Sequence, residues 1–129
     1  MIEAKFPSLG TVLEFHSRLI ERYGGSHGLR DQSALESALA AAQNRYLYEE
    51  SDLAACAATY VYHLSKAHAF IDGNKRIAWA VAILFLEING VILTVPETEA
   101  EELCMRIAAR RITLDEVERV LSQWVLIAN

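Results

Sequence analysis

The chain has 129 residues, a length typical of one domain with its own core, and we therefore predict a single domain over residues 1–129. Its 53% hydrophobic content, with only six Gly and two Pro, excludes disordered and fibrous proteins. The formal net charge of −5 argues against general nucleic-acid binding, so we expect no direct nucleic-acid partner, although a local basic patch stays open.

The first predicted helix covers residues 11–23, because apolar side chains recur along it at helical spacing. Its inward positions are Val12, Phe15 and Leu19. Gly24-Gly25 should end it, since glycine readily takes the left-handed conformation found after helices. The isolated histidines His16 and His27 are expected on the surface.

A second helix is predicted to begin near Ser33, which forms a capping-box pattern with Glu36, unless Asp31 is the cap instead. Its apolar positions are Leu35, Ala38, Leu39 and Ala42. We expect this helix to fade near Arg45 and residues 46–50 to form an extended or irregular connection.

Ser51 or Asp52 is expected to cap a third helix. Its inward side chains are Leu53, Ala57, Tyr60, Val61 and Leu64. A polar loop follows at residues 68–76, and the next helix, over about residues 73–89, contains the most apolar stretch of the chain. Asn89-Gly90 should end that helix, before a short extended stretch.

A fifth helix is predicted over about residues 97–109, because Pro96 stands where a first helical turn tolerates proline. Thr113 and Glu116 form a second capping box, which opens a last helix. The apolar stripe of that helix consists of Leu114, Val117, Leu121 and Trp124. Six helices and almost no strand predict an all-α fold.

The cysteines indicate a cytoplasmic protein, and the longest apolar run is too short for a membrane span. Cys56 and Cys104 each lie in an apolar helical pattern and are expected to be buried free thiols, which is typical of a reducing compartment. The start of the chain lacks the pattern of a signal peptide, and the apolar run from Ile77 stops at Glu87, short of the ~20 residues of a membrane span. We expect no membrane partner.

The loop from His68 to Arg76 carries the candidate chemistry. A neutral His68 can accept the proton of an attacking hydroxyl at cytosolic pH. Gly73 and Asn74 begin the apolar helix, and the free N–H groups of a helix start bind anions, which glycine allows to approach closely.

The remaining polar residues of the loop suit a phosphate and its counterion. Asp72 would repel a phosphate unless Mg²⁺ lay between them, and Mg²⁺ prefers one or two carboxylates together with phosphate oxygens. Lys75 and Arg76 add positive charge, and the planar guanidinium suits phosphate oxygens. Phe70 is expected to be a buried anchor for the loop.

Each of these residues alone has an ordinary structural interpretation. A histidine before a helix, an aspartate as N-cap and a solvated Lys-Arg pair are all common. Their occurrence together beside the most apolar helix favours a functional site, because a buried helix holds a site rigidly. A zinc site is not expected, since His63 and His68 are badly spaced for two ligands on one helix face.

The loop resembles the signature of the Fic/Doc family, His-x-Phe-x-Asp/Glu-Gly-Asn-x-Arg. The positions that match are His68, Phe70, Asp72, Gly73, Asn74 and Arg76. Further stretches look like the short Doc branch, named for the death-on-curing toxins of bacterial toxin–antitoxin pairs. These stretches are residues 22–25, 28–31, 35–39, 84–86 and 89–90. The resemblance implies a compact six-helix bundle with the motif loop at the start of a central buried helix.

The resemblance also implies roles for these residues, with ATP and Mg²⁺ as cofactors. His68 would be the general base for a Ser or Thr hydroxyl of a target protein, and Asp72 would bind Mg²⁺. Gly73 and Asn74 would form the anion site, while Arg76 would hold nucleotide phosphates. In this family a flap positions the target segment, and the candidate here is residues 45–50.

Lys75 separates two activities within the family. Adenylyl-transferring Fic proteins have glycine there, and a second arginine at the position of Trp79. The lysine of Doc-type proteins goes with ATP bound in the reverse sense and with transfer of its γ-phosphoryl group, elongation factor Tu being the known substrate. We therefore expect a Doc-like protein kinase toxin. Ile77 and Gly73 depart from residues frequent in the family without touching the proposed proton chemistry.

Two alternatives stay open, namely an adenylyl transferase and a catalytically idle binding module of the same fold. Many Fic proteins carry an inhibitory helix reading Ser/Thr-x-x-x-Glu-Gly/Asn. The nearest approach here, Thr98 to Glu102, is followed by Leu103. Inhibition is therefore expected from a separate antitoxin that covers the active-site groove.

Overall fold

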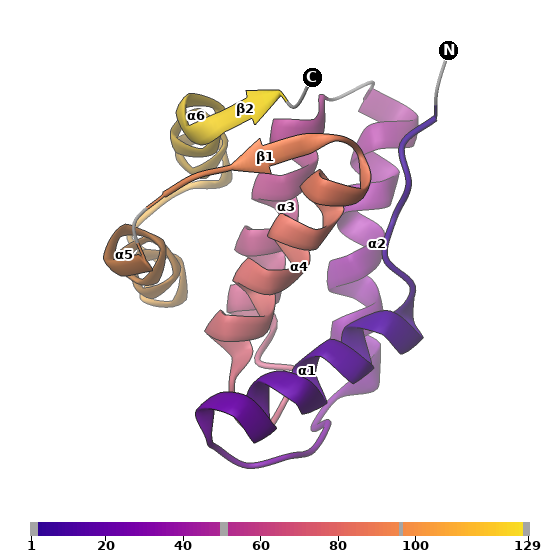
Figure 1. The fold of residues 1–129 in the computed structure, drawn as a ribbon, viewed down its shortest axis with the longest axis vertical. Coiled ribbons are helices and arrows are strands. Elements are labelled where there is room, and N and C mark those ends of the chain that lie inside the picture. Colours follow the sequence, from indigo (N-terminus) through magenta and orange to yellow (C-terminus); the bar gives the residue numbers. More distant parts are fainter. Residues whose placement is uncertain (1–2, 50–51, 96, 128–129) are drawn as a thin grey trace.

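The computed structural model describes residues 3–49, 52–95 and 97–127 as a bundle of helices with one small sheet (Figure 1). The helices are α1 (Leu9–Tyr23), α2 (Gln32–Glu49), α3 (Leu53–Ala67), α4 (Asn74–Ile88), α5 (Glu97–Ala108) and α6 (Leu114–Trp124). The strands are β1 (Val91–Leu93) and β2 (Val125–Ile127). The all-α prediction is confirmed. No helix in the described part of the chain is long and apolar enough to cross a bilayer.

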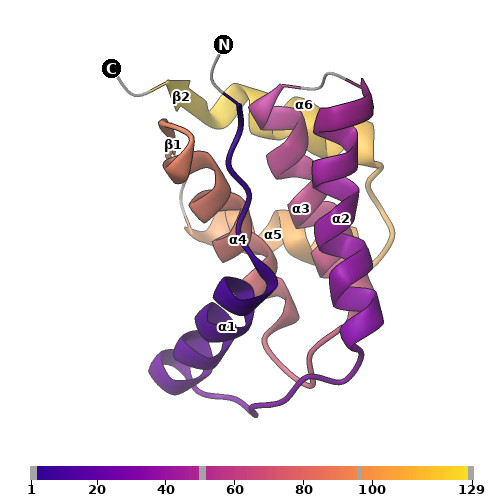
Figure 2. The same cartoon turned by 90° about the vertical axis from the view of Figure 1, so that its right-hand side faces the viewer.

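Helices α3 and α4 form the centre of the bundle and pack along each other. Helix α2 lies against α3, while α1 crosses the N-terminal half of α4 at the lower end of the molecule (Figures 1 and 2). Helices α5 and α6 cover the opposite side of the central pair. The loop between α3 and α4 therefore opens next to α1, at one end of the bundle.

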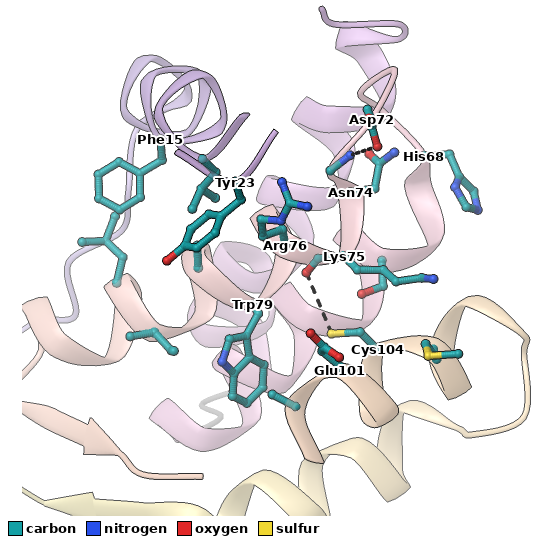
Figure 3. Close-up of a pocket in the computed structure, with 18 of the residues that line it drawn as sticks. Phe15, Tyr23, His68, Asp72, Asn74, Lys75, Arg76, Trp79, Glu101 and Cys104 are labelled. Atoms are coloured by element: carbon teal, nitrogen blue, oxygen red, sulfur yellow. Dashed lines mark hydrogen bonds between the residues drawn. The ribbon is translucent and has the colours of Figure 1, made fainter. Parts of the chain in front are cut away.

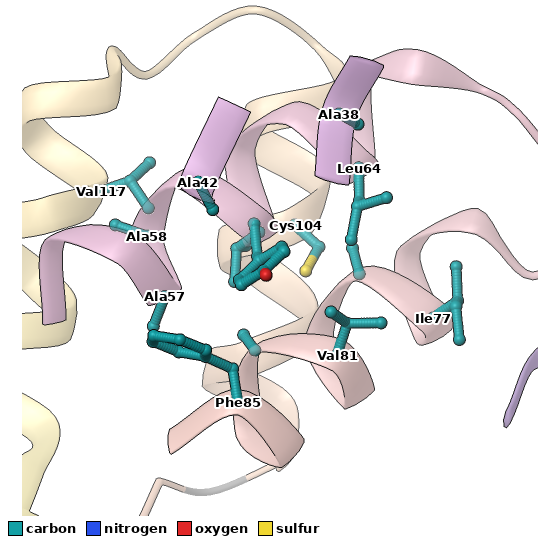
Figure 4. Close-up of a cluster of buried hydrophobic side chains, with 14 of the residues drawn as sticks. Ala38, Ala42, Ala57, Ala58, Leu64, Ile77, Val81, Phe85, Cys104 and Val117 are labelled. Carbon is teal, nitrogen blue, oxygen red and sulfur yellow. The ribbon is translucent and has the colours of Figure 1, made fainter. Parts of the chain in front are cut away.

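Small side chains on α3 let its neighbours approach closely, and aromatic rings fill the space that remains (Figure 4). Ala57 and Ala58 are fully buried, and the Tyr60 ring lies 5.3 Å from that of Phe85 on α4. Burial of a large apolar side chain contributes roughly 1.5–3 kcal/mol, so this centre holds α4 firmly.

Both cysteines are free and buried, as predicted. Burial raises the pKa of Cys56 and of Cys104 to about 11, because a thiolate is poorly solvated there. Neither thiol is therefore a ready nucleophile.

Helix α2 differs from the prediction at both ends. The Asp31 side chain caps it by accepting from the N–H of Ala34, so the capping box at Ser33 is wrong and the alternative cap is confirmed. The helix also continues through Arg45 to Glu49, where an extended connection was expected. Arg45 explains this, because its guanidinium donates to the Ala55 carbonyl on α3 and pairs with Glu118 on α6 at 2.6 Å.

The remaining boundaries agree closely with the sequence patterns. Asp52 caps α3, and Thr113 forms a reciprocal capping box with Glu116 at the start of α6. Ser51 and Pro96 lie outside the described residues. Strand β1 falls on the predicted extended stretch, and it pairs antiparallel with β2, which the helical pattern did not predict.

Candidate functional site

A groove of about 960 Å³ lies between α1 and α5, with α4 as its floor. Every residue predicted for the site contributes to its lining. These residues are His68, Asp72, Gly73, Asn74, Lys75 and Arg76. They occupy one end of the groove, while apolar and aromatic side chains such as Phe15 and Trp79 line the rest (Figure 3).

His68 ends helix α3 in an unusual backbone conformation. Its φ of 47° and ψ of 42° are left-handed, which stops the helix and turns the chain into the loop. The His68 side chain is exposed and lines the groove, whereas the next two residues, Ala69 and Phe70, are buried. The turn thus leaves the imidazole open to a substrate and anchors the loop behind it.

Asn74 and Phe70 hold the loop against the start of α4. The Asn74 carboxamide accepts from the Phe70 N–H and donates to the Phe70 carbonyl, both at 2.9 Å. The Phe70 ring is 3% exposed, which confirms the predicted anchor. Because the Asn74 side chain is committed to this clamp, its backbone N–H is the group left free at the start of α4.

The segment of residues 24–31 lies along the loop. The Ile71 N–H donates to the Gly28 carbonyl at 3.0 Å, and the Arg30 N–H donates to the Ala69 carbonyl at 2.7 Å. The Arg76 guanidinium donates to the Gly24 carbonyl at 3.1 Å. This segment therefore forms the edge of the site.

The candidate flap at residues 45–50 is wrong. Residues 45–49 belong to α2, and Arg45 is tied to α3 and α6 rather than to the loop. Glu50 lies outside the described residues. The sequence pattern failed here because the pairing partner of Arg45, Glu118, is 73 residues away and gives no local signal. The segment next to the site is residues 24–31.

Asp72 has its carboxylate held in the ionised form. Its Oδ2 accepts from the Ser26 N–H at 3.1 Å and its Oδ1 from the Gly73 N–H at 2.8 Å. These two bonds, in that order, lower the pKa of the Asp72 carboxyl, and the nearby Arg76 charge lowers it further. Asp72 is not the N-cap of α4. The N-cap is Gly73, whose φ is 76°.

The start of α4 presents a concentrated positive field. Gly73 provides no side-chain cap, and among the described residues no hydrogen bond satisfies the N–H groups of Asn74, Lys75 and Arg76. The Lys75 and Arg76 side chains are exposed at this helix end, with the Arg76 guanidinium 5.6 Å from the centre of the Tyr23 ring. Such a helix start attracts anions, and the two cations strengthen it.

His16 is buried beside the motif loop, so the expected surface position is wrong. It is 3% exposed, and its Nε2 lies 2.7 Å from the Asp72 carbonyl oxygen. The i, i+4 spacing of Val12, His16 and Ile20 is the signal that was available, since these three form the buried face of α1. Phe15 and Leu19, predicted to face inward, line the groove instead.

Comparison with known proteins agrees with the motif. The sequence model of the Fic/DOC family matches residues 6–86. The chain is 41% identical to the Protein kinase doc of Escherichia phage P1 over 81 residues, which cover 62% of this chain and 64% of that protein. It is 36% identical to the Toxin Doc of Mycolicibacterium smegmatis over 111 residues, which cover 83% of this chain and 85% of that protein.

Proposed function

The chain belongs to the Fic/Doc family, and from that premise we propose that it is a Doc-type toxin kinase. It transfers the γ-phosphoryl group of ATP to a Ser or Thr hydroxyl of a translation factor similar to elongation factor Tu, which arrests translation and growth. One observation carries the proposal. An exposed histidine and an uncapped, doubly cationic helix start line the same end of one groove.

His68 is the general base in this proposal. Its exposed imidazole accepts the proton of the target hydroxyl as the oxygen attacks the γ-phosphorus of ATP. The new O–P bond forms while the bond between the γ-phosphorus and the bridging oxygen breaks, so ADP leaves with that electron pair. The left-handed end of α3 leaves the exposed His68 ring on the lining of the groove.

The α4 start receives the phosphate oxygens. The N–H groups of Asn74, Lys75 and Arg76 point out of the helix, and the side chains of Lys75 and Arg76 add two positive charges. These groups stabilise negative charge that develops on the transferred phosphoryl group and on the departing ADP.

Asp72 suits a magnesium ion. Its carboxylate is exposed and ionised, and each oxygen accepts only one backbone N–H, which leaves lone pairs free. No cluster of three metal-binding side chains occurs in the described residues, so the ion would share Asp72 with phosphate oxygens, as Mg²⁺ commonly does. When bound, Mg²⁺ neutralises phosphate charge.

The second candidate function is adenylyl transfer by the same base and the same anion site. Lys75 favours the kinase, because its side chain adds bulk and charge at the second residue of α4, where adenylyl-transferring relatives have glycine. The 41% identity to a protein named as a kinase supports the same choice.

Labelled ATP separates the two activities. The protein is incubated with elongation factor Tu and with ATP labelled at either the γ- or the α-phosphate. We expect label on the target only from the γ position. Label from the α position alone would mean that the chain is an adenylyl transferase. The Lys75→Gly variant shows whether this side chain selects between the two.

The third possibility, an idle binding module of this fold, is tested by growth. Expression of the kinase arrests growth, whereas expression of the His68→Ala variant does not. Equal growth of the two strains, with no label transferred by either protein, would favour the binding module.

The apolar part of the groove suits an antitoxin. Phe15 and Leu19 on α1 and Met105 on α5 all line the groove, and such an apolar trough accepts the apolar side of a protein segment. We propose that an antitoxin covers the groove in this way and that the pair acts in the cytoplasm.

A further inference from the structure

Helix α1 carries a buried histidine that the proposed chemistry does not use. His16 is 3% exposed and lies on the buried face of α1, whereas its neighbour Phe15 lines the groove. A buried imidazole needs a polar partner, because an unsatisfied ring nitrogen costs free energy. The partner of its Nε2 is the carbonyl oxygen of Asp72, at 2.7 Å.

This contact determines which nitrogen carries hydrogen. A carbonyl oxygen only accepts hydrogen bonds, so Nε2 has to be the donor. His16 therefore donates a hydrogen bond to the peptide unit that joins Asp72 to Gly73, the N-cap of α4. The same nitrogen would lie only 3.5 Å from a Cβ atom at Gly73, so the ring and this peptide are in close contact.

A second contact holds the other part of the loop. The His16 ring stacks on the Phe70 ring with a centroid separation of 3.8 Å and an interplanar angle of 12°. Asn74 clamps the backbone of Phe70 from the α4 side, so the loop between Phe70 and Gly73 is held from two helices. The groups whose positions depend on this support are the Asp72 carboxylate and the start of α4.

We propose that His16 is a positioning residue, which acts through Asp72 and Phe70 to hold the motif loop in the geometry required for transfer. It touches no substrate itself. The proposal deepens the proposed function and rests on it for the activity measurements. One of the three tests below is independent of any activity.

Two substitutions separate the hydrogen bond from the packing. His16→Gln retains an N–H donor near the position of Nε2 and loses the aromatic ring, whereas His16→Phe retains a ring on Phe70 and loses the donor. We expect His16→Phe to unfold near the wild-type temperature and to lower kcat for transfer by about 10- to 100-fold. His16→Gln should be less stable, but its kcat should stay within about 3-fold of wild type.

The Michaelis constants add a second test. Because His16 does not reach the groove, the KM for the protein target should change by less than about 3-fold in either variant. A purely structural role predicts the opposite order of activities, with His16→Phe active and His16→Gln inactive in proportion to its unfolded fraction. That order would overturn the proposal.

The third test needs no substrate. Nitrogen-15 NMR of the imidazole side chains identifies the protonated ring nitrogen, and we expect hydrogen on Nε2 of His16, with a signal lost in His16→Gln. Hydrogen on Nδ1 alone would overturn the proposal. If wild type transfers no label while His16 has hydrogen on Nε2, the proposed function fails and the hydrogen bond stands.

Discussion

His68 combines an exposed ring with a backbone conformation that few residues adopt. A left-handed non-glycine residue costs of order 1 kcal/mol, and such strain persists only where the surroundings enforce it. Here the next two residues, Ala69 and Phe70, are buried, and their burial holds His68 in this conformation. The strained backbone orients the side chain that we propose as the general base. Strained residues cluster at active sites.

Replacing His68 by asparagine tests this role with little structural damage, since asparagine tolerates the left-handed region. We expect transfer to fall by about 10²- to 10⁴-fold, the usual contribution of a general base. The thermal unfolding temperature should stay close to that of wild type. The control is His63→Asn, a half-buried histidine on α3 that does not line the groove, and its folded fraction should transfer at the wild-type rate. A His68→Asn protein with full activity would remove histidine from the mechanism.

At the scale of elements, the site depends on how closely residues 24–31 follow the motif loop. Gly25 has a φ of 115°, and a Cβ atom there would stand 2.7 Å from Oδ2 of Asp72. Gly24 has a φ of 89°, but apart from its chain neighbours no described residue has an atom within 4 Å of the position of its Cβ. A side chain is strained at both glycines because their φ values are positive. Only at Gly25 would the added Cβ also collide with the loop.

Gly25→Ala should impair the site more than Gly24→Ala. Both variants incur backbone strain of roughly 1–3 kcal/mol, but only in the Gly25 variant does the added Cβ force the Asp72 carboxylate or the segment to move. We expect the Gly25→Ala protein to lose at least about 10-fold in kcat, and the Gly24→Ala protein to lose several-fold less while folded, since its strain reaches the site only through the Gly24 carbonyl and Arg76. Steady-state kinetics at a temperature well below both unfolding transitions measures the difference. Equal kinetics for the two variants would contradict the role of this segment.

The capping box of α6 gives a pH-dependent stability. Hydrogen bonds from the Thr113 N–H and hydroxyl to Glu116 lower the pKa of the Glu116 carboxyl below its usual 4.5. A lowered folded-state pKa contributes stability that is fully present above the unfolded value and is lost as the pH falls through the folded value. Denaturant unfolding between pH 6 and pH 3 should therefore show a smaller decrease for Glu116→Gln than for wild type.

Thr113→Ala should destabilise the protein by about 0.5–2 kcal/mol at pH 7, because the first turn of α6 loses its cap. Transfer by the folded fraction should be unchanged, since Thr113 lies outside the groove.

A Glu116→Gln protein whose stability falls with pH as steeply as that of wild type would show that the Glu116 carboxylate does not carry the pH dependence.

Across the whole molecule, the sequence predicts those features that depend on residues close together in the chain. Helix α4 and the capping box at Thr113 depend on residues a few positions apart, so their patterns were sufficient. The end of α2 and the burial of His16 depend on partners 73 and 56 residues away. Such tertiary contacts override local preference and leave only a weak periodic signal.

Arg45 connects α2 to the rest of the bundle and should matter for stability alone. Its guanidinium, with the side chain 15% exposed, bonds to the Ala55 carbonyl, Thr59 and Glu118. Arg45→Met should lower the free energy of unfolding by about 1–3 kcal/mol, because it leaves the partly buried Glu118 without its partner. Chemical denaturation measures this loss, and transfer at low temperature should remain normal. Reduced transfer by fully folded Arg45→Met would show that this distant contact also shapes the groove.

The central claim is that His68 and the α4 start move a phosphoryl group from ATP to a protein hydroxyl. The most direct test is the intact mass of elongation factor Tu after incubation with the protein, ATP and Mg²⁺. Our account predicts a gain of one phosphoryl group on a Ser or Thr residue with wild type, and no gain with His68→Asn. A gain of an adenylyl group, or a phosphoryl gain that persists in His68→Asn, would contradict it.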